Sequence, residues 1–327
     1  MSRGVLVAQV GPEGFDFNQL GNALINGVAL GAVYALLALG FVIIFKATQV
    51  INFAHGSLAA IGAFLTASFF TILNFPGRFL PELPTWARWS LSALCAVLAA
   101  SVVGLIVERV FIRPMVGEPL FSVAIITIGA DIILRTINDD FVGQGVRSLQ
   151  DPWGIQVVKL GELNVNQTQI VTVGVSLLCF GLVAWFLRSR LGIAMRATAF
   201  DQEAAQAQGI NVGRIFAVAW AIGAALAAVA GIFSSVAPRA AGITNATAFV
   251  VFRAFPAIII GGLDSVVGAV VGGFLVGIAE VVIGTYSAGF SNVIGVGFGL
   301  IVPYLLMLIF LLFRPYGLFG TEEIRRV

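Results

Sequence analysis

Long apolar runs separated by short polar turns dominate the chain. A helix needs about 20 mostly apolar residues to cross the hydrocarbon core of a bilayer. Nine runs approach or meet that length, at residues 22–45, 53–73, 88–111, 119–137, 168–187, 214–236, 249–263, 266–286 and 291–313. The run 249–263 is the weakest because it is short and contains Arg253 and Pro256, so it is either a crossing or a re-entrant, broken helix. The pattern predicts an all-α polytopic membrane protein of 8 or 9 transmembrane helices.

A polar loop at residues 188–214 interrupts this pattern and contains residues that typically begin and end a helix. Asp201 is a good N-cap, Gln202 to Gln208 are mostly strong helix formers, and Gly209 suits the position after a helix. We therefore expect a short structured helix at the membrane surface. Such a helix is suited to pushing on another molecule, so a transporter with a separate soluble motor is the leading hypothesis.

The basic residues predict the orientation of the chain. Arginine and lysine near the ends of membrane spans favour the cytoplasmic side. An external N-terminus and an internal C-terminus place ten basic residues inside and seven outside. The four arginines of the loop 188–214 weigh most, together with the tail RPYGLFGTEEIRR. We expect a periplasmic N-terminus and a cytoplasmic loop and C-terminus.

Composition narrows the class further. Hydrophobic residues make up 59% of the chain and charged residues 10%, against about 25% charged in a soluble domain. The lipid bilayer is thus the expected surroundings, and a net charge of +2 without a basic stripe gives no reason to expect a nucleic-acid partner. No soluble domain or linker divides the apolar runs. We expect a single transmembrane domain over residues 1–327, with its membrane core at 20–320.

The sequence contains no GxxxxGK[S/T] phosphate-binding loop, so ATP hydrolysis by that route requires another subunit. The only histidine is His55, and no ligand pattern accompanies it, so no metal site is predicted. No nucleophile elbow or orienting acid supports a catalytic role for it either.

Small residues recur with helical spacing in two of the predicted spans. Gly27, Gly31 and Ala35 share one face of the first, and the run 266–286 repeats the device with the pairs Gly268/Gly272 and Gly273/Gly277. Close helix packing is the ordinary reason for such a stripe. A smooth substrate path is the alternative. Asn26 on the first span predicts an interhelical hydrogen bond.

The first polar break is NFAHGS, which contains Asn52, His55, Gly56 and Ser57. Irregular backbone at membrane depth must face protein or a watery cavity, and transporters use such breaks to bind substrates. The alternative is an interfacial turn capped by Asn52 and Ser57.

A second break, GGLDS, contains Gly261, Gly262 and Ser265. Each break places a serine before a helix of small residues, which suggests a weak internal repeat. Both breaks are candidates for the substrate path.

Charged residues inside membrane spans are costly and point to function by default. Glu108 and Arg109 lie near Arg113 and predict a structural ion pair. Asp131 and Arg135 are one turn apart and can neutralise each other. Glu280 and Arg253 have no obvious local partner. A proton relay through Glu280 or Asp131 is therefore an alternative source of energy for transport.

Several of these segments together resemble the LivH-type permease subunits of branched-chain amino acid ABC importers. The resemblance lies in NGVALGAVYALLALGFVIIF, INFAHGSLAAIGAF, RATAFDQEAAQAQGIN, RIFAVAWAIGAALAAVAGI, IIGGLDSVVGAVVGGFLVGIAE and RPYGLFG. These blocks cover roughly residues 22–65 and 188–320.

The resemblance implies an importer of the bacterial inner membrane that works by alternating access. Its expected partners are a second, related permease, two ABC ATPase subunits that bind ATP and Mg²⁺, and a periplasmic amino-acid-binding protein. It also implies that Asp201, Glu203, Ala204, Ala205 and Gly209 belong to the helix that docks on an ATPase. This chain keeps E-A-A-x-x-x-G but lacks the later Leu-Pro of the fullest motif.

The resemblance leaves other functions open. Urea or a short-chain amide is an alternative cargo within the same superfamily. A proton-driven secondary transporter and a membrane scaffold without transport activity are rivals from other classes.

Overall fold

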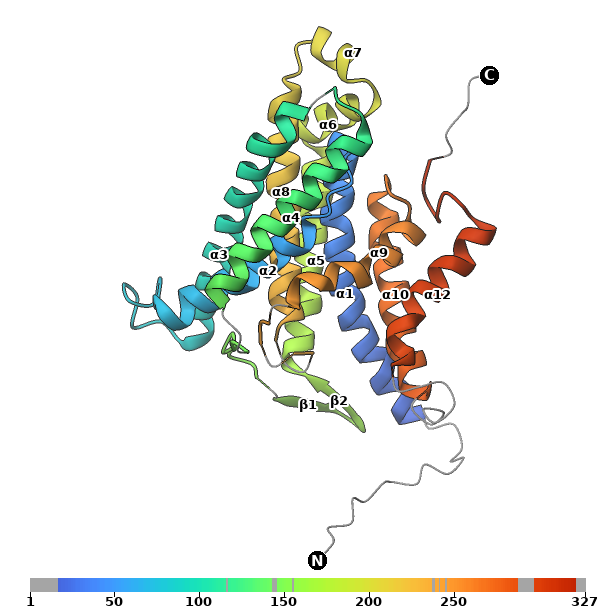
Figure 1. Cartoon of the computed structure of the whole chain (residues 1–327). Coiled ribbons are helices and arrows are strands. Elements are labelled where there is room, and N and C mark those ends of the chain that lie inside the picture. Colours follow the sequence, from blue (N-terminus) through green and yellow to red (C-terminus); the bar gives the residue numbers. More distant parts are fainter. Residues whose placement is uncertain are drawn as a thin grey trace, which may run out of the picture.

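The computed structural model describes residues 17–115, 117–142, 146–154, 156–236, 239–240, 242–244, 246–287 and 297–321. They form a bundle of helices with a small surface helix, α7, at one end and the β1–β2 hairpin at the other (Figure 1). The α-helices are α1 Phe17–Thr48, α2 His55–Ala67, α3 Thr85–Val107, α4 Leu120–Val142, α5 Gln167–Arg188, α6 Arg190–Phe200, α7 Gln202–Ala207, α8 Val212–Ser234, α9 Val250–Gly261, α10 Val266–Ser287 and α12 Phe298–Phe313.

Short irregular helices extend several of these elements. Two π-helical turns, η1 (Ser68–Ile72) and η2 (Glu108–Ile112), continue α2 and α3. Two 3-10 turns, η3 (Arg113–Met115) and η4 (Thr247–Phe249), follow η2 and precede α9.

The predicted spans agree with the helices of the structure. Seven helices in the described residues are long and apolar enough to cross a membrane, and the shorter apolar helices Thr247–Gly261 and Phe298–Phe313 complete the nine predicted runs. The α9 segment has 12 residues and is therefore about 18 Å long, well short of the ~30 Å hydrocarbon core. Of the two alternatives for residues 249–263, the broken or re-entrant helix fits. The part of the last run at 291–296 lies outside the described residues.

A β-hairpin in the loop 138–167 was not predicted. Strand β1 (Val157–Leu160) pairs antiparallel with β2 (Leu163–Asn166), with Val158 opposite Val165. Each strand has only four residues, too few for alternation to be recognised in the sequence. The hairpin ends at α5, where Asn166 and Gln169 form a capping box.

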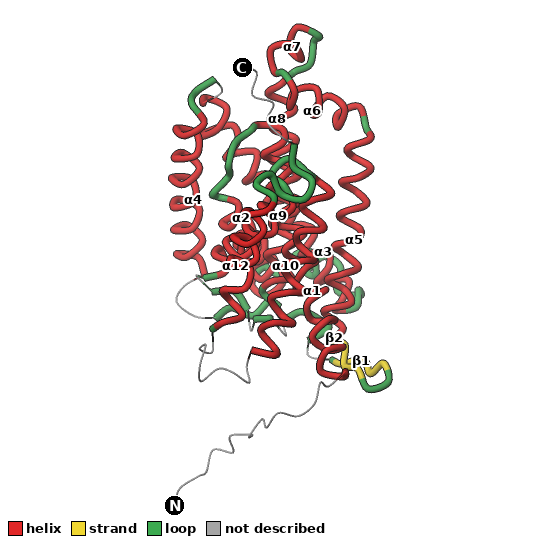
Figure 2. The backbone as a smooth tube through the Cα atoms, turned by 90° about the vertical axis from the view of Figure 1, so that its right-hand side faces the viewer, coloured by secondary structure: helices red, strands yellow, loops and turns green. Residues whose placement is uncertain are grey.

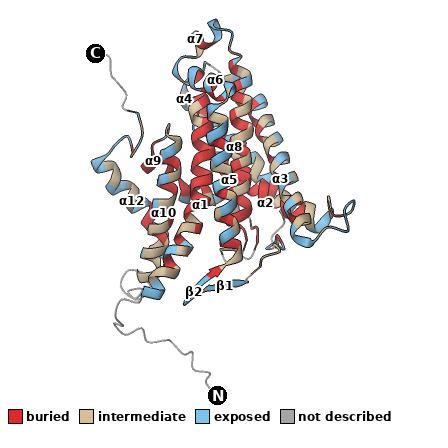
Figure 3. Ribbon diagram, turned by 180° about the vertical axis from the view of Figure 1, so that it is seen from behind, coloured by how far each residue is buried: buried red, intermediate tan, exposed pale blue. Residues whose placement is uncertain are grey.

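Helix α1 occupies the centre of the bundle. Its residues are buried almost continuously from Gly31 to Ile44 (Figure 3). By contrast, α4 and α5 expose most of their surface, as the peripheral helices of a membrane protein do when lipid or another subunit covers them. Figure 2 shows α4 and α5 on opposite sides of the bundle. The short helices α2 and α9 lie between them, at mid-height.

The stripe on α1 packs against the pair Gly273/Gly277 of α10, and the pair Gly268/Gly272 packs against α9, which confirms the packing interpretation. A Cβ atom added to Gly31 would lie 2.8 Å from the Cα of Phe274, and one added to Gly27 would lie 2.8 Å from the Cα of Ile278. On the other side, Gly273 faces Ala35 and Gly277 faces Gly31. Helices α1 and α10 therefore approach with their backbones almost in contact, and a larger side chain at these positions would separate them.

The end of the bundle that carries α7 also carries most of the described basic side chains near helix ends. Arg113 pairs with the buried Glu108 at 3.0 Å and donates to the carbonyl of Gly213 at 2.9 Å, which joins the ends of α3 and α8. This confirms the predicted structural ion pair, with Arg113 as the partner of Glu108.

Candidate functional site

The short helix in the polar loop forms as predicted. Helix α7 runs from Gln202 to Ala207, and the Asp201 carboxylate accepts the backbone N–H of Ala204 at 2.9 Å. Gly209 has a φ of +81°, a left-handed conformation that glycine adopts without strain. The N–H of Ile210 returns to the carbonyl of Ala205 at 3.0 Å and closes the C-terminal turn. The helix is thus a defined element, with Glu203 and Ala204 exposed on its surface.

Helix α6 connects α7 to the core. Ser189 caps α6 by accepting the N–H of Gly192 at 3.3 Å, and Met195 is buried in the central hydrophobic cluster that includes residues of α1 and α8. Ala205 of α7 is also buried. Helix α7 is therefore linked through α6 to the packed centre of the bundle.

Phe200, the last residue of α6, was not singled out in the sequence. Its side chain is 96% exposed, immediately before the Asp201 cap. Aromatic residues, including phenylalanine, are enriched at protein–protein interfaces, so the exposed Phe200 is a candidate contact for a partner protein. Its exposure depends on how α6 is rotated against α1, so the pattern of residues alone did not reveal it.

The first polar break lies deep within the bundle, between α1 and α2. The Asn52 side chain accepts the backbone N–H of Ala54 at 3.0 Å. Asn52 therefore caps the turn, as the second of the two interpretations of this break predicted. Thr127 of α4 holds the same segment, since its hydroxyl accepts the N–H of Phe53 at 3.2 Å and donates to the carbonyl of Ile51 at 3.0 Å. The irregular backbone is therefore satisfied by protein groups, as membrane depth requires.

Two polar atoms in this break are buried without a partner in the described residues. His55 Nε2 bonds the carbonyl of Leu37 at 3.0 Å and must carry the hydrogen, because a carbonyl can only accept. This leaves His55 Nδ1 as an unpaired acceptor, and Asn52 Nδ2 is an unpaired donor. Both residues are completely buried. Asn52 and His55 are three residues apart in the sequence, and buried polar groups without a partner call for an explanation, so they mark a candidate functional site.

The prediction that Ser57 caps the following helix is wrong. Helix α2 begins at His55, so Ser57 lies within its first turn. The Ser57 hydroxyl instead donates to the carboxylate of Asp131 on α4, at 2.5 Å. Asp131 also pairs with Arg135 at 3.4 Å, which confirms the predicted i, i+4 pair. The serine was recognised, but its partner lies 74 residues away and could not be read from local spacing.

Gly56 allows the break to meet η4. A Cβ atom at this position would lie 2.7 Å from a side-chain carbon of Val251 and closer still to the carbonyl of Ala248. The start of α9 therefore packs directly on the start of α2. Both irregular starts are brought together at mid-height in the bundle (Figure 2).

An aromatic row runs along α9 beside this junction. It consists of Phe249, Phe252 and Phe255, with centroids 6.0 Å apart between consecutive rings. The Arg135 guanidinium lies 5.1 Å from the centre of the Phe249 ring, so the row adjoins the Asp131–Arg135 pair. Together with the exposed Arg253 of α9, these residues form a surface that we call the polar face. Cations on a membrane-depth surface require water or another protein subunit beside them, because lipid tails solvate charge poorly.

The second break is packed and satisfied. The Ser265 hydroxyl caps α10 by accepting the N–H of Gly268 at 3.0 Å. Gly261 packs on Gly268, and Gly262, with a φ of +105°, contacts the backbone of Gly320. This break lies at the other end of α9, about 18 Å from the first, so the structure does not bring the two together. Its neighbours are structural elements of the chain itself.

Two further polar residues have structural partners. The side-chain oxygen of Asn26 on α1 accepts a hydrogen bond from the side chain of Gln169 on α5. This confirms the predicted interhelical hydrogen bond. Glu280, which has no obvious partner in the sequence, accepts the hydroxyl of Tyr34 at 2.8 Å across the α1–α10 contact. No group of His, Cys, Asp and Glu that could hold a metal occurs in the part of the chain that the structure describes.

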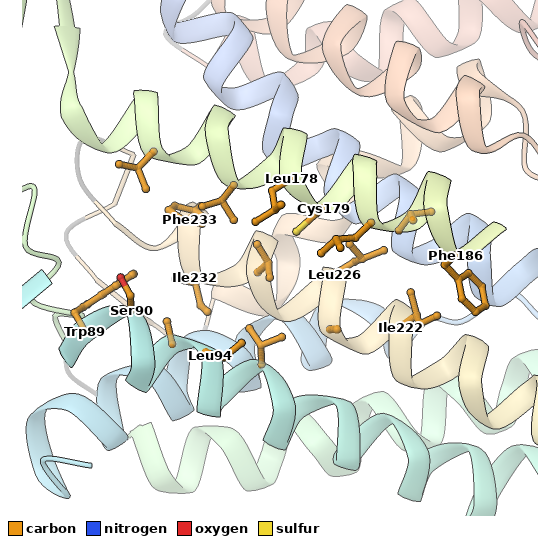
Figure 4. Close-up of a pocket in the computed structure, with 18 of the residues that line it drawn as sticks. Trp89, Ser90, Leu94, Leu178, Cys179, Phe186, Ile222, Leu226, Ile232 and Phe233 are labelled. Atoms are coloured by element: carbon orange, nitrogen blue, oxygen red, sulfur yellow. The ribbon is translucent and has the colours of Figure 1, made fainter. Parts of the chain in front are cut away.

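A cavity of about 620 Å³ between α3, α5 and α8 has a different character. The close-up shows Trp89 and Ser90 at one end, Phe186 at the other, and aliphatic side chains between them (Figure 4). The Ser90 hydroxyl donates a hydrogen bond to the carbonyl of Trp86 at 2.8 Å. The lining offers little to a charged solute, since burying an unpaired charge among apolar groups is strongly unfavourable. The cavity is therefore better suited to an apolar group, such as a lipid acyl chain.

Comparison with known proteins agrees with this architecture. Residues 23–311 match the family described as "Branched-chain amino acid transport system / permease component". The chain is 33% identical over 324 residues to the high-affinity branched-chain amino acid transport system permease protein BraD of Pseudomonas aeruginosa, covering 97% of this chain and 100% of the relative. It is 31% identical over 317 residues to the corresponding LivH of Escherichia coli, covering 93% and 96% of the two chains.

An archaeal relative extends the similarity. The probable branched-chain amino acid transport permease protein LivH of Methanocaldococcus jannaschii is 30% identical over 298 residues, which is 88% of each chain. The family match covers most of the sequence and includes both polar breaks, α6, α7 and the polar face. The chain therefore belongs to the branched-chain amino acid transport permease family.

Proposed function

We propose that this chain is one of two permease subunits of an ABC importer that carries branched-chain or related amino acids across a bacterial inner membrane. Separate ATPase subunits would supply the energy. The observation that carries the proposal is α7, a capped helix that stands out from the bundle beside the exposed Phe200. Such a helix has no evident use within the chain itself. It suits a groove on a soluble partner, with Glu203 and Ala204 at the contact and Asp201, Ala205 and Gly209 fixing the shape of the helix.

The proposed orientation places α7 in the cytoplasm. Arg188, Arg190, Arg196 and Arg214 flank this end, and Lys46 lies there too, donating to the carbonyl of Asp264 at 3.0 Å. The excess of basic residues close to helix ends favours the cytoplasmic side. The start of α1 lies at the opposite end, with the β1–β2 hairpin (Figure 1). The N-terminus would thus be periplasmic, and the hairpin and neighbouring loops would receive the amino-acid-binding protein.

The polar face is proposed to pair with a second permease. Arg135 and Arg253 reach the surface of the described chain at membrane depth, and so do Phe249 and Phe252. A second subunit would shield the arginines from lipid and would enclose a path between the two chains. This path would pass the first break, where Asn52, His55, Gly56 and Ser57 lie. Its unpaired donor and acceptor can replace part of the hydration of a zwitterion.

The mechanism follows from these two sites. ATP binding would close the ATPase pair and move α7, and α6 would pass that movement to α1 and α8. Energy can be transmitted in this way only if the ATPases bind the inward- and outward-facing conformations with different free energies. The permease pair would then alternate between the two conformations, with the first break exposed to each side in turn. The chain itself would bind no nucleotide.

Substitutions on α7 test the coupling. Glu203→Lys reverses a charge on the exposed surface of the helix, and Gly209→Arg adds bulk and strains the left-handed turn. We expect both variants to reach the membrane but to lose ATP-driven uptake and co-purification of ATPase subunits. Glu82→Lys, a charge reversal in an exposed loop at the opposite end, is the control for Glu203→Lys. Gly209→Asn controls the second variant because asparagine tolerates the same backbone conformation.

Normal uptake by Glu203→Lys and Gly209→Arg would overturn the coupling assignment. Uptake that requires a proton gradient but no ATPase would instead favour a secondary transporter. The cargo itself is tested separately, by competition of labelled leucine with valine, urea and acetamide in the same vesicles. Competition by urea or acetamide, but not by valine, would assign the amide branch of the superfamily.

A further inference from the structure

A cavity of about 340 Å³ opens beside the polar face, between the end of α8 and the start of α9. It is distinct from the apolar cavity and is much richer in polar groups. Its lining contains two arginines and no acid among the described residues. The polar members of the lining are Ser234, Ser235, Arg239, Thr244, Thr247 and Arg253.

Neither arginine forms a salt bridge with an acid in the described chain, although Arg253 lies close enough to the buried Glu280 to interact with it electrostatically. The salt bridges found there join Glu108 with Arg113 and Asp131 with Arg135. Arg239 is held in place instead by a neutral contact, since one guanidinium nitrogen donates to the carbonyl of Phe233 at 3.0 Å. The remaining guanidinium donors of Arg239, and those of Arg253, are available to an anion. Two unpaired guanidinium groups in one cavity form a strong site for a carboxylate, which arginine can bind through two parallel hydrogen bonds.

The rest of the lining fits the other parts of an aliphatic amino acid. Phe249, Val250 and Val146 offer apolar surface for the side chain. The hydroxyls of Ser234 and Ser235 both donate to the carbonyl of Gly231, at 2.9 Å, so their oxygens remain able to accept hydrogen bonds from an ammonium group.

We propose that this cavity is a capture site in the permease for the carboxylate of an aliphatic amino acid, with Arg239 and Arg253 as the anion-binding residues. The inference rests on the proposed function and assigns the recognition of substrate charge to residues outside the two polar breaks. Arg253 also belongs to the polar face, so the cavity would lead directly to the path between the two permeases. A cation would be repelled by the two guanidinium groups, and a neutral amide would lack the charge and the bidentate geometry of a carboxylate, so both would be disfavoured at this step.

A cysteine probe tests the charge of the cavity without relying on uptake. Ala246 lines the cavity and is exposed, so Ala246→Cys can be placed in a chain with Cys95→Ser and Cys179→Ser. The full chain, with the subunits that co-purify, is reacted in nanodiscs with an anionic and a cationic methanethiosulfonate. Val157→Cys in the hairpin is the control, because Lys159 and Glu162 are both nearby. Clefts lined by one sign of charge raise local counter-ion concentration by about 10-fold or more, so we expect at least this preference for the anionic reagent at Ala246→Cys relative to the control.

Substitution and protection complete the test. Arg239→Gln with Arg253→Gln should reduce the preference to that of the control, whereas Arg253→Lys should retain most of it. Millimolar leucine should slow the modification of Ala246→Cys at least twofold, as about half occupancy of the site would do. Leucinamide, which lacks the carboxylate, should not. Equal protection by leucinamide, or an unchanged preference in the double glutamine variant, would overturn the proposal.

Lipid phosphate is the other anion within reach of a membrane protein. Nanodiscs of phosphatidylcholine alone and nanodiscs with added phosphatidylglycerol distinguish the two sources. If phosphatidylglycerol blocks the modification and leucine does not, the cavity is a lipid site and the proposal fails. The outcome is separable from that of the α7 variants. Loss of the labelling pattern with intact ATP-driven uptake removes only the capture site, and an intact pattern without ATP coupling removes only the importer mechanism.

Discussion

The two polar breaks have similar sequences but different surroundings. In the first, His55 Nδ1 and Asn52 Nδ2 are buried and unpaired, and the neighbouring ion pair of Asp131 and Arg135 lies on the polar face. In the second, Ser265 caps α10, and Gly262 packs against the C-terminal segment at Gly320. The first break therefore has a hydrogen-bond donor and an acceptor without partners, whereas the Ser265 hydroxyl of the second break has a partner within the protein.

This difference distinguishes a candidate functional site from a structural connection between two helices. Buried polar groups are almost always satisfied in native proteins, so the exceptions call for a ligand or for a second conformation. A satisfied break merely allows two helices to meet at an angle. We therefore propose that the substrate path passes the residues of the first break and that Gly261, Gly262 and Ser265 only connect α9 with α10. The following predictions compare the two breaks directly.

The largest difference is expected for the acid beside each break. Asp131→Leu removes the partner of Arg135 and the acceptor of the Ser57 hydroxyl, and breaking a buried pair costs about 3–5 kcal/mol. Asp131 is 16% exposed, so solvent will reduce this cost. We still expect uptake to fall at least tenfold, which corresponds to about 1.4 kcal/mol in the activation free energy of transport. Asp264→Leu is the matched variant at the second break, where the half-buried Asp264 carboxylate accepts hydrogen bonds from Thr321.

Uptake by vesicles with each variant, normalised to the amount of permease in the membrane, gives the comparison. Asp264→Leu should keep uptake within about twofold of the unmodified chain, because the partner of its side chain is Thr321 in the C-terminal segment and not a residue of the proposed path. Equal losses in the two variants would show that the breaks do not differ in function.

A smaller effect is expected at His55. His55→Ala removes the hydrogen bond to Leu37 and the unpaired Nδ1, so we expect it to lower uptake more than it lowers the yield of folded permease. His55→Gln is the control because its amide can still donate to the Leu37 carbonyl. If His55→Ala reduces yield but leaves uptake per folded molecule unchanged, the histidine is only a packing residue.

The smallest effect separates the two turn-capping side chains. Asn52→Ala and Ser265→Ala each remove an acceptor for one backbone N–H, and each should cost about 1 kcal/mol of stability. Thermal unfolding in detergent, followed by size-exclusion chromatography, should show similar shifts for both. Uptake should fall several-fold only for Asn52→Ala, because only Asn52 also carries an unpaired donor. A larger fall in uptake for Ser265→Ala would reverse our assignment of the two breaks.

The sequence predicted local features well and long-range partners poorly. The membrane spans, the α7 helix with its Asp201 cap and the close-packing role of the glycine stripes follow from spacing along one helix, so they were predicted. That α1 and α10 are partners in this packing was not predicted. The partner of Ser57 on α4, the partner of Glu280 on α1 and the exposure of Phe200 depend on how distant helices are rotated against each other. The cavity between Arg239 and Arg253 was missed for the same reason, since Arg239 follows the end of α8 and Arg253 lies on α9.

Reconstitution tests the central claim most directly, that the chain is a path driven by a separate nucleotide-hydrolysing machine. Proteoliposomes containing the complete set of co-purified subunits should accumulate leucine against its gradient only when ATP and the binding protein are supplied. Vesicles containing this chain alone should never do so, with or without a proton gradient. Uphill accumulation by the chain alone would contradict the account.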